Sequence, residues 1–127
     1  MIETPSILIT DDDPVFRETL CGVLEPEGFR TLVAGSGEEA WELVKANEIH
    51  VALFDMHMPR LTGLETLRLV KQFKSLMPCI LMSARLDEQI RAEAARADAF
   101  AVLAKPISRI DLTGSVRQAL RRTYGWG

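Results

Sequence analysis

Five short apolar runs are spaced along the chain, and polar segments with helical periodicity separate them. Each run is continuous rather than alternating, which is typical of strands that are buried on both faces of a parallel sheet. The runs predict strands at residues 7–10, 30–34, 51–54, 79–82 and 100–103.

The segment after the first run has the features of an amphipathic helix. Its apolar residues are three or four positions apart, as they are on one face of a helix. Asp13 is a suitable N-cap and Pro14 suits the first helical position, whereas Pro26 should stop the helix.

The remaining helices follow the later strands. Ser36 and Glu39 have the spacing of a capping box that opens the second helix, and Ser108 and Asp111 have the same spacing before the last one. The last three helices are predicted at residues 63–73, 86–97 and 108–122. Because strand and helix alternate five times, the sequence predicts an α/β fold with a five-stranded, doubly wound parallel sheet and five helices.

Polar side chains stand where the predicted strands end. Asp11 and Asp12 follow the first strand, Asp55 ends the third, Ser83 ends the fourth and Lys105 ends the fifth. The carboxyl ends of the strands form one edge of an open α/β sheet, and ligands bind there at the switch in strand order. We therefore expect these residues to converge on one crevice.

Three carboxylates in one crevice require a cation. At an effective dielectric constant near 20, two unit charges about 5 Å apart repel by roughly 3 kcal/mol. A small set of hard oxygen ligands suits Mg²⁺, and a carboxylate can act as a covalent nucleophile in phosphoryl transfer. Lys105 and Ser83 can stabilise charge on a transferred phosphoryl group. Asp11 and Asp12 are adjacent and suited to holding metal, which leaves Asp55 as the expected nucleophile.

The composition is that of an ordinary globular domain, with 47% apolar and 26% charged residues. A chain of 127 residues has the usual size of one domain, so we expect a single domain over residues 1–127 with its core at about 5–123. The net charge of −3 argues against direct nucleic-acid binding by this portion. The N-terminus lacks a signal-peptide pattern and the apolar runs are too short to span a membrane, so we expect a cytoplasmic protein.

The sequence resembles the receiver domain of bacterial response regulators in four segments that occur in the family's order. These segments are Ile7-Leu8-Ile9-Thr10-Asp11-Asp12-Asp13-Pro14 with Arg17, Asp55-Met56-His57-Met58-Pro59 with Gly63, Met82-Ser83-Ala84, and Lys105-Pro106. Any one segment is weak evidence, whereas the four together are specific. The resemblance covers essentially all of residues 5–123.

The resemblance implies a flavodoxin-like sheet with strand order 2-1-3-4-5. It implies that Asp55 accepts phosphate from a sensor histidine kinase or a phosphotransfer protein. It also implies that Mg²⁺ is bound by the carboxylates of Asp11, Asp12 and Asp55 and by the backbone carbonyl of His57. Such a domain is a phosphorylation switch that catalyses its own phosphorylation and slow hydrolysis, not a turnover enzyme. Its output, through an unidentified domain or protein, is expected at the face formed by the fourth helix, fifth strand and fifth helix, and a phosphorylation-dependent homodimer is compatible with it.

The fifth predicted strand departs from the family pattern. A Tyr or Phe often stands three residues before the lysine and acts as a rotamer switch coupled to the Ser or Thr, but this chain has Val102 there. Phe100, two positions earlier, is expected on the opposite face. We therefore expect the signal to pass through the Ser83 loop and the fourth helix.

Two further residues are expected to modulate the switch. His57 and Arg85 stand two positions past Asp55 and Ser83, respectively. In the family these positions flank the path of the water that attacks the phosphoryl group. We expect both side chains to tune the lifetime of the phosphorylated state.

Two other functions are left open by the sequence. Asp11-x-Asp13-x-Val15 also fits the start of haloacid-dehalogenase-type phosphatases, with Asp11 as nucleophile and Asp13 as general acid/base. That family requires a further acidic motif after its lysine, whereas the only acid after Lys105 is Asp111, at a helix cap. The other alternative is a receiver-like binding module that takes no phosphate, for which the missing aromatic residue is the only hint.

Overall fold

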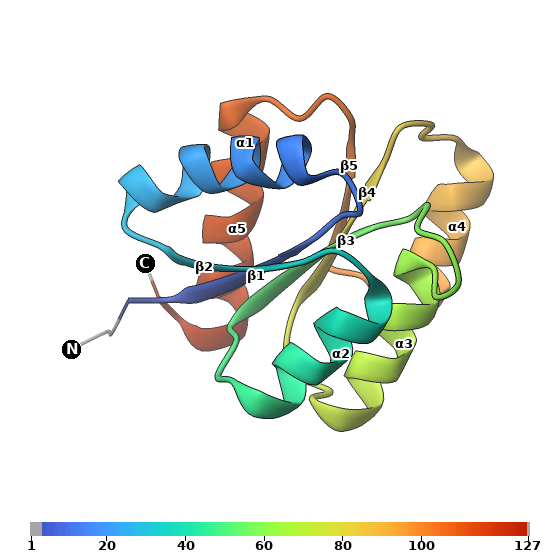
Figure 1. Cartoon of the computed structure of the whole chain (residues 1–127), viewed down its shortest axis with the longest axis horizontal. Coiled ribbons are helices and arrows are strands. Elements are labelled where there is room, and N and C mark those ends of the chain that lie inside the picture. Colours follow the sequence, from blue (N-terminus) through green and yellow to red (C-terminus); the bar gives the residue numbers. More distant parts are fainter. Residues whose placement is uncertain (1–3, 127) are drawn as a thin grey trace.

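A five-stranded parallel sheet forms the centre of the molecule (Figure 1). The computed structural model describes residues 4–126. The strands are β1 (Ser6–Thr10), β2 (Arg30–Ala34), β3 (Val51–Asp55), β4 (Cys79–Ser83) and β5 (Ala101–Ala104). All neighbouring strands pair in parallel, and their order is β2-β1-β3-β4-β5. The predicted fold class and strand order are confirmed.

Helices cover both faces of this sheet (Figure 1). They are α1 (Pro14–Leu24), α2 (Gly37–Ala46), α3 (Gly63–Phe73), α4 (Glu88–Arg96) and α5 (Arg109–Tyr124). α1 and α5 lie on one face, and α2, α3 and α4 lie on the other. Each face therefore has its own apolar cluster, as expected for a doubly wound sheet.

The central strands are apolar throughout because successive side chains enter different clusters. On β1, Leu8 belongs to the cluster beneath α2, α3 and α4, whereas Ile7 and Ile9 belong to the cluster beneath α1 and α5. Every residue of β1, β3 and β4 is buried. The positions at which these strands end are consequently fixed by the core.

The ends of α1 follow the predicted signals. The Asp13 carboxylate caps the helix by accepting a hydrogen bond from the Val15 N–H (3.0 Å), and Pro14 is the first helical residue. The α-helix ends at Leu24, and Pro26 lies in the short 3₁₀ turn η1 (Glu25–Glu27) that follows.

The predicted start of the fourth helix was wrong by two residues. α4 begins at Glu88 rather than at Leu86, because Asp87 is the N-cap and its carboxylate accepts from the Ile90 N–H (2.9 Å). Leu86 instead packs against the core from the preceding loop. Asp87 is a typical N-cap residue in the sequence, but the helical spacing of apolar residues extends back to Leu86, and the predicted start followed that spacing.

The capping boxes also differ from the prediction. The Ser36 hydroxyl accepts from the Glu39 N–H (3.1 Å), but the Glu39 carboxylate accepts from the N–H of Gly35 and not from that of Ser36. Among the described hydrogen bonds, the box that opens α5 is likewise present only as its serine half. The reciprocal box occurs instead between Thr62 and Glu65, where it fixes the first turn of α3 beside the end of β3.

Val102 and Phe100 lie on opposite sides of the sheet, as expected. Val102 packs against the cluster beneath α2, α3 and α4, and Phe100 packs against the cluster beneath α1 and α5. Strand alternation is not the reason, because residues two apart in a strand share a face. Phe100 instead precedes Ala101, the first residue of β5, and so lies outside the alternation. β5 itself carries no aromatic residue.

Among the helices described by the structure, none combines the length and the hydropathy that crossing a bilayer requires.

Candidate functional site

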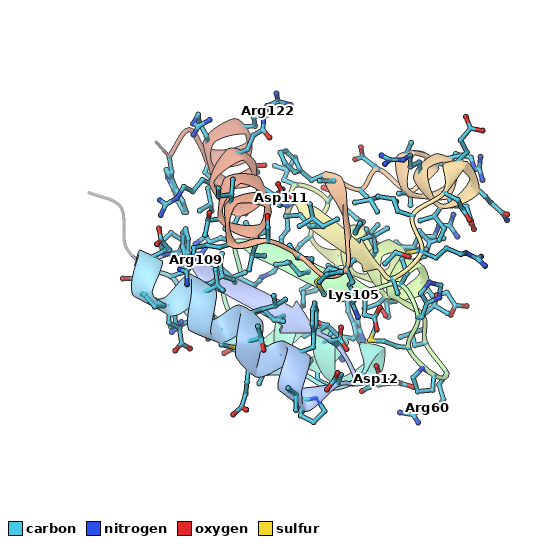
Figure 2. All side chains as sticks on the ribbon, turned by 90° about the horizontal axis from the view of Figure 1, so that it is seen from above. Asp12, Arg60, Lys105, Arg109, Asp111 and Arg122 are labelled. Carbon is cyan, nitrogen blue, oxygen red and sulfur yellow. The ribbon has the colours of Figure 1, made fainter. Side chains whose placement is uncertain are left out.

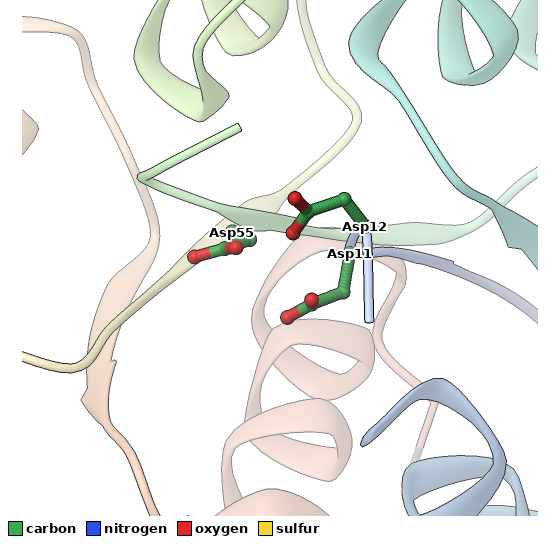
Figure 3. A group of neighbouring side chains, drawn as sticks. All are labelled: Asp11, Asp12 and Asp55. Atoms are coloured by element: carbon green, nitrogen blue, oxygen red, sulfur yellow. The ribbon is translucent and has the colours of Figure 1, made fainter. Parts of the chain in front are cut away.

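Three aspartates meet at the carboxyl edge of the sheet (Figure 3). Asp11 and Asp12 follow β1, and Asp55 is the last residue of the adjacent strand β3. One ligand oxygen from each carboxylate lies within 4.8 Å of the others. Asp11 and Asp55 are almost completely buried, with 1% and 4% of their surfaces exposed, whereas Asp12 is exposed. The predicted convergence of the strand ends therefore produces a compact acidic site.

The backbone around Asp11 holds its carboxylate in place. The Asp13 N–H donates to Asp11 Oδ1 (2.9 Å), and Arg17 Nη1 donates to the Asp11 carbonyl oxygen (2.7 Å). Arg17 is on α1, so this contact ties the start of that helix to the loop that carries the acids. Arg17 was part of the receiver-like sequence pattern, but this contact was not predicted from it.

Asp55 is positioned by β4 and by the start of α3. The N–H of the next residue, Met56, donates to the carbonyl of Met82 (2.8 Å), and the His57 N–H donates to Asp55 Oδ1 (3.2 Å). Gly63 passes so close that a Cβ built on it would lie 2.1 Å from the Asp55 carbonyl oxygen. Glycine is therefore required at this close approach of the two backbones.

Lys105 reaches back from the end of β5 to the acids. Its Nζ lies 2.7 Å from Asp11 Oδ2 and 3.4 Å from Asp55 Oδ1. The same ammonium lies 4.4 Å from the centre of the Phe16 ring, which adds a cation–π contact from α1. Figure 2 shows Lys105 and Asp12 at this edge, away from the end of α5 that carries Arg122. From the sequence, Phe16 was predicted only as part of the apolar face of the first helix, and its contact with Lys105 was not.

Burial and charge shift the pKa values of this site in a consistent way. Burial raises the pKa of the Asp55 carboxyl, and the nearby Asp11 charge raises it further, against the opposing effects of the His57 N–H and Lys105. Burial by itself would lower the pKa of Lys105, but its hydrogen bond to Asp11 and the charges of Asp55 and Asp11 outweigh this effect. The pKa of Lys105 is therefore raised, and the lysine remains a cation.

The Ser83 hydroxyl is engaged by the loop that follows it. Ser83 ends β4, one residue beyond the residue that pairs with Asp55, and is completely buried. Its Oγ donates to the Arg85 carbonyl (2.7 Å) and accepts from the Arg85 N–H (3.1 Å). His57 Nε2 lies 3.4 Å from the same oxygen. The Lys105 N–H donates to the Ser83 carbonyl (2.8 Å), which joins the ends of β4 and β5.

The two expected modulating residues lie differently. The His57 imidazole is on the exposed loop after β3 and reaches Ser83. The Arg85 guanidinium pairs with Asp87 (3.3 Å) and not with the three aspartates of the site, and 79% of the Arg85 side chain is exposed. Val102 lies outside the site, because it pairs with Leu81 two positions before the end of β4.

The donor set fits a divalent cation. The site contains three carboxylates, and among the described residues Lys105 is the one cation whose charged group contacts them. Two negative charges are thus left uncompensated, which matches the charge of a hard divalent ion such as Mg²⁺. Asp11, Asp12 and Asp55 could therefore hold a metal ion together.

Residues 7–117 match the family model described as the response regulator receiver domain. The transcriptional regulatory protein YvrH of Bacillus subtilis is 32% identical over 97% of this chain and 52% of its own length. The transcriptional regulatory protein CpxR of Escherichia coli is 35% identical over 93% of this chain and 50% of its own length. The chain thus spans about half the length of these curated relatives.

Solved receiver domains share the fold. The CheY-like receiver domain protein of Methanospirillum hungatei superposes with a TM-score of 0.92 at 25% identity, covering 98% of this chain and 100% of its own. A receiver domain of Clostridium thermocellum gives 0.87 at 30% identity, covering 93% and 95%. The response regulator TrrA of Thermotoga maritima, solved in complex with Mg²⁺ and BeF, gives 0.84 at 27% identity, covering 92% and 100%. From the sequence match, the shared fold and the acidic site at the sheet edge, we conclude that this chain belongs to the response regulator receiver family and is a signalling switch domain.

Proposed function

We propose that Asp55 accepts a phosphoryl group in a Mg²⁺-dependent reaction and that this modification switches the domain. One observation carries the proposal. Asp55 Oδ1 contacts the His57 N–H and Lys105, but Oδ2 has no hydrogen-bond or ion-pair partner among the described residues. Among the described residues, Thr10 Oγ1 is the one side-chain oxygen that is both buried and without a partner. Asp55 Oδ2, which also lacks a partner, is therefore accessible and open to an incoming group. An oriented carboxylate with one open oxygen has the geometry of a nucleophile.

The neighbouring acids are less suited to attack. Asp11 Oδ1 accepts from the Asp13 N–H, and Asp11 Oδ2 is paired with Lys105 at 2.7 Å. Asp13 caps α1 through its carboxylate, so it is occupied by a structural role. These contacts weigh against the phosphatase alternative, which needs Asp11 as nucleophile and Asp13 as acid/base. Asp12 is exposed and has no hydrogen-bond or ion-pair partner among the described residues, so it can face a metal ion.

We assign the metal to the carboxylates of Asp11, Asp12 and Asp55, together with the His57 backbone carbonyl. When bound, Mg²⁺ would neutralise the acids and the oxygens of the phosphoryl group. The complex of TrrA with Mg²⁺ and BeF supports the choice of ion by analogy. In the transfer, the phosphorus forms a bond to Asp55 Oδ2 and its bond to the donor, a phosphohistidine nitrogen, breaks.

Lys105 and Ser83 are proposed to bind the transferred group. Lys105 supplies a fixed positive charge beside Asp55. The Ser83 hydroxyl donates to the Arg85 carbonyl, so donation to a phosphoryl oxygen requires it to leave that bond. Loss of this bond would free the loop that leads to α4. Because Val102 provides no aromatic switch, this loop is the route by which we expect the signal to leave the site.

The lifetime of the phosphorylated state is proposed to depend on His57 and Arg85. His57 lies beside Ser83 and is the better placed of the two. Arg85 would have to leave Asp87 to reach an attacking water. Measuring dephosphorylation of His57→Ala and Arg85→Ala separates them, and an unchanged rate removes the corresponding residue from this role.

The wider setting is also part of the proposal. We infer a single receiver domain over residues 1–127, cytoplasmic, phosphorylated by a sensor histidine kinase or phosphotransfer protein and acting on an output domain or partner. The names of the relatives, which are transcriptional regulatory proteins, support a role in controlling transcription. A phosphorylation-dependent homodimer and the absence of turnover activity and of direct nucleic-acid binding by this portion belong to the same proposal.

Intact mass spectrometry after incubation with acetyl phosphate and Mg²⁺ tests the proposal. We expect one added phosphoryl group, and none in Asp55→Asn or in a metal-chelated sample. Addition that survives Asp55→Asn but not Asp11→Asn would support the phosphatase alternative. No addition under any condition would support the phosphate-independent module.

A further inference from the structure

A second surface lies at the amino edge of the sheet, where α3 ends and β4 begins. We call it the Leu76 surface and define it as Phe73, Lys74, Leu76 and Arg122. Leu76 is 83% exposed, the largest value among the large apolar residues described by the structure, and Phe73 is 52% exposed. Figure 2 shows Arg122 at the far end of α5 from Asp111 and Lys105, so this surface is remote from the acidic site.

The exposure of Leu76 follows from the turn between α3 and β4. The Met77 N–H donates to the Lys74 carbonyl (3.2 Å), which closes the turn. Met77 is thereby buried with 3% of its surface exposed, and Leu76 points outward. A polar residue would serve an outward turn position equally well. Two large apolar side chains, three positions apart and lining one hollow, form a patch rather than a scattered exposure.

Leu76 separates two hollows in this surface. The first has a volume of about 360 Å³ and is lined by Ile49, Phe73, Lys74, Ser75, Leu76, Met77 and Tyr124. The second has a volume of about 250 Å³ and is lined by Lys71, Leu76, Pro78, Asp98, Ala99, Phe100, Arg122 and Thr123. Each is large enough to take one apolar side chain, and each has one of the two defining cations at its wall.

The charges at this surface favour an acidic partner. Asp98 is paired with Lys71 (3.9 Å), and Glu48 lies 3.8 Å from the imidazole of His50. Lys71, Lys74 and Arg122 thus outnumber the two nearby acids, Asp98 and Glu48. Lys74 Nζ donates only to the backbone carbonyl of Asn47 (3.2 Å). Among the described residues, no carboxylate pairs with Lys74 or Arg122. The whole chain carries a net charge of −3, so this local excess of cations does not reflect the overall composition.

We propose that the Leu76 surface docks an acidic, amphipathic segment of a partner protein. Two apolar side chains of that segment enter the hollows on either side of Leu76, and its carboxylates pair with Lys74 and Arg122. The surface is separate from Asp55, so the docking needs no phosphoryl group.

Fluorescence anisotropy of a labelled synthetic peptide tests this proposal on the unphosphorylated full chain. The probe is an amphipathic helix with Leu and Phe on one face and Glu on the other. We expect saturable binding that weakens with salt. NMR shift changes should be concentrated at residues 73–78, 98–100 and 122. The same peptide with Lys in place of Glu should bind at least tenfold more weakly.

Matched variants locate the contact. Leu76→Ser should weaken binding about tenfold, as expected for an apolar anchor at the centre of an interface. Lys74→Glu combined with Arg122→Glu should weaken it at least as much and remove its salt dependence. Ile110→Ser removes a similarly exposed apolar residue elsewhere, and Arg91→Glu combined with Arg96→Glu reverses two exposed cations on α4 and so matches the charge change of the double variant. Both controls should bind as the unaltered protein does.

Three results would overturn the proposal. The first is the absence of saturable binding to the acidic peptide. The second is binding that Leu76→Ser leaves intact and that Ile110→Ser abolishes, which would place the peptide elsewhere. The third is a concentration-dependent dimer that Leu76→Ser dissolves, which would assign the surface to a second copy of this chain. Leu76, Arg122, Ile110, Arg91 and Arg96 are exposed, and half-buried Lys74 gives up one hydrogen bond to a backbone carbonyl, so circular dichroism should show that every variant folds.

Discussion

Replacing Asp55 by Asn should stabilise the metal-free protein at neutral pH. Burial and the Asp11 charge raise the pKa of the Asp55 carboxyl above its usual value of 3.8. The folded chain therefore holds the ionised carboxylate less favourably than the unfolded chain does. The contribution of protonated Asp55 to the free energy of unfolding is fully present below the unfolded-state pKa. It is lost as the pH rises through the folded-state pKa. The loss grows as the pH rises above 3.8, and Asn avoids it.

The size of the effect follows from the distances in the site. Oxygens of Asp11 and Asp55 lie within 4.8 Å, which at an effective dielectric constant of 20 gives a repulsion of at least about 3.5 kcal/mol. Lys105, at 3.4 Å from Asp55, attracts it by about 5 kcal/mol on the same scale. The attraction exceeds this repulsion by about 1.5 kcal/mol on the same scale, so a gain from Asn requires that the cost of burying the carboxylate be larger than this difference. Because Asn can still accept hydrogen bonds at this position, we expect a gain of about 1–2 kcal/mol.

Calorimetric melts of Asp55→Asn and the unaltered protein at pH 4 and pH 7 would test this expectation. The midpoint of the variant should be higher by roughly 3–8 °C at pH 7 in chelator, and the difference should shrink towards pH 4. Adding Mg²⁺ should stabilise the unaltered protein far more than the variant, because ligand binding to the folded state adds stability. Asp12→Asn, at an exposed position, is the control and should show a smaller gain. A variant that is less stable than the unaltered protein at pH 7 in chelator would refute the reasoning.

Three further predictions concern single positions. Thr10 Oγ1 is the one buried side-chain oxygen or nitrogen without a hydrogen-bond partner among the described residues, so Thr10→Val should raise the free energy of unfolding by about 1 kcal/mol in urea denaturation, and Thr10→Ser should not. Gly63→Ala would place a Cβ 2.1 Å from the Asp55 carbonyl oxygen, so it should lower the free energy of unfolding by roughly 2 kcal/mol or more and slow phosphorylation by acetyl phosphate, whereas Gly114→Ala, with nothing within 4 Å, should not destabilise. Burial raises the pKa of Cys79 to about 12, so the free energy of unfolding should fall as the pH rises above 9.0 towards 12, and Cys79→Val should reduce that fall in alkaline denaturation. An unchanged alkaline profile in Cys79→Val would contradict the last of these.

The fold was predictable because a continuous apolar run indicates a strand that is covered on both faces, whatever the details of the packing. Ile7, Leu8 and Ile9 are apolar in succession, and only a strand covered on both faces buries all three. The errors fell at element ends, where local hydrogen bonds compete with periodicity. Asp87 moved the start of α4 by capping it. Asp98 adopts a left-handed conformation (φ 62°) in the turn before β5.

The candidate site was predictable in membership but not in contacts. Asp11, Asp12 and Asp55 had to meet because parallel strands end at the same edge. The sequence did not predict that Lys105 lies closer to Asp11 than to Asp55, because that difference depends on the distances between the ends of β1, β3 and β5. The bond from Ser83 to the Arg85 carbonyl depends in the same way on the path of one loop.

The sequence by itself determined the alternation of strands and helices, the burial of the central strands and the set of acids at their ends, because periodicity and chain order suffice for these. Only the tertiary structure decided which oxygen of Asp55 is left open, where the Ser83 hydroxyl donates and how Leu76 comes to stand between two hollows. These features arise where segments distant in the chain approach within a few ångströms. Such distances are set by the packing of the whole core, and no local pattern of residues encodes them.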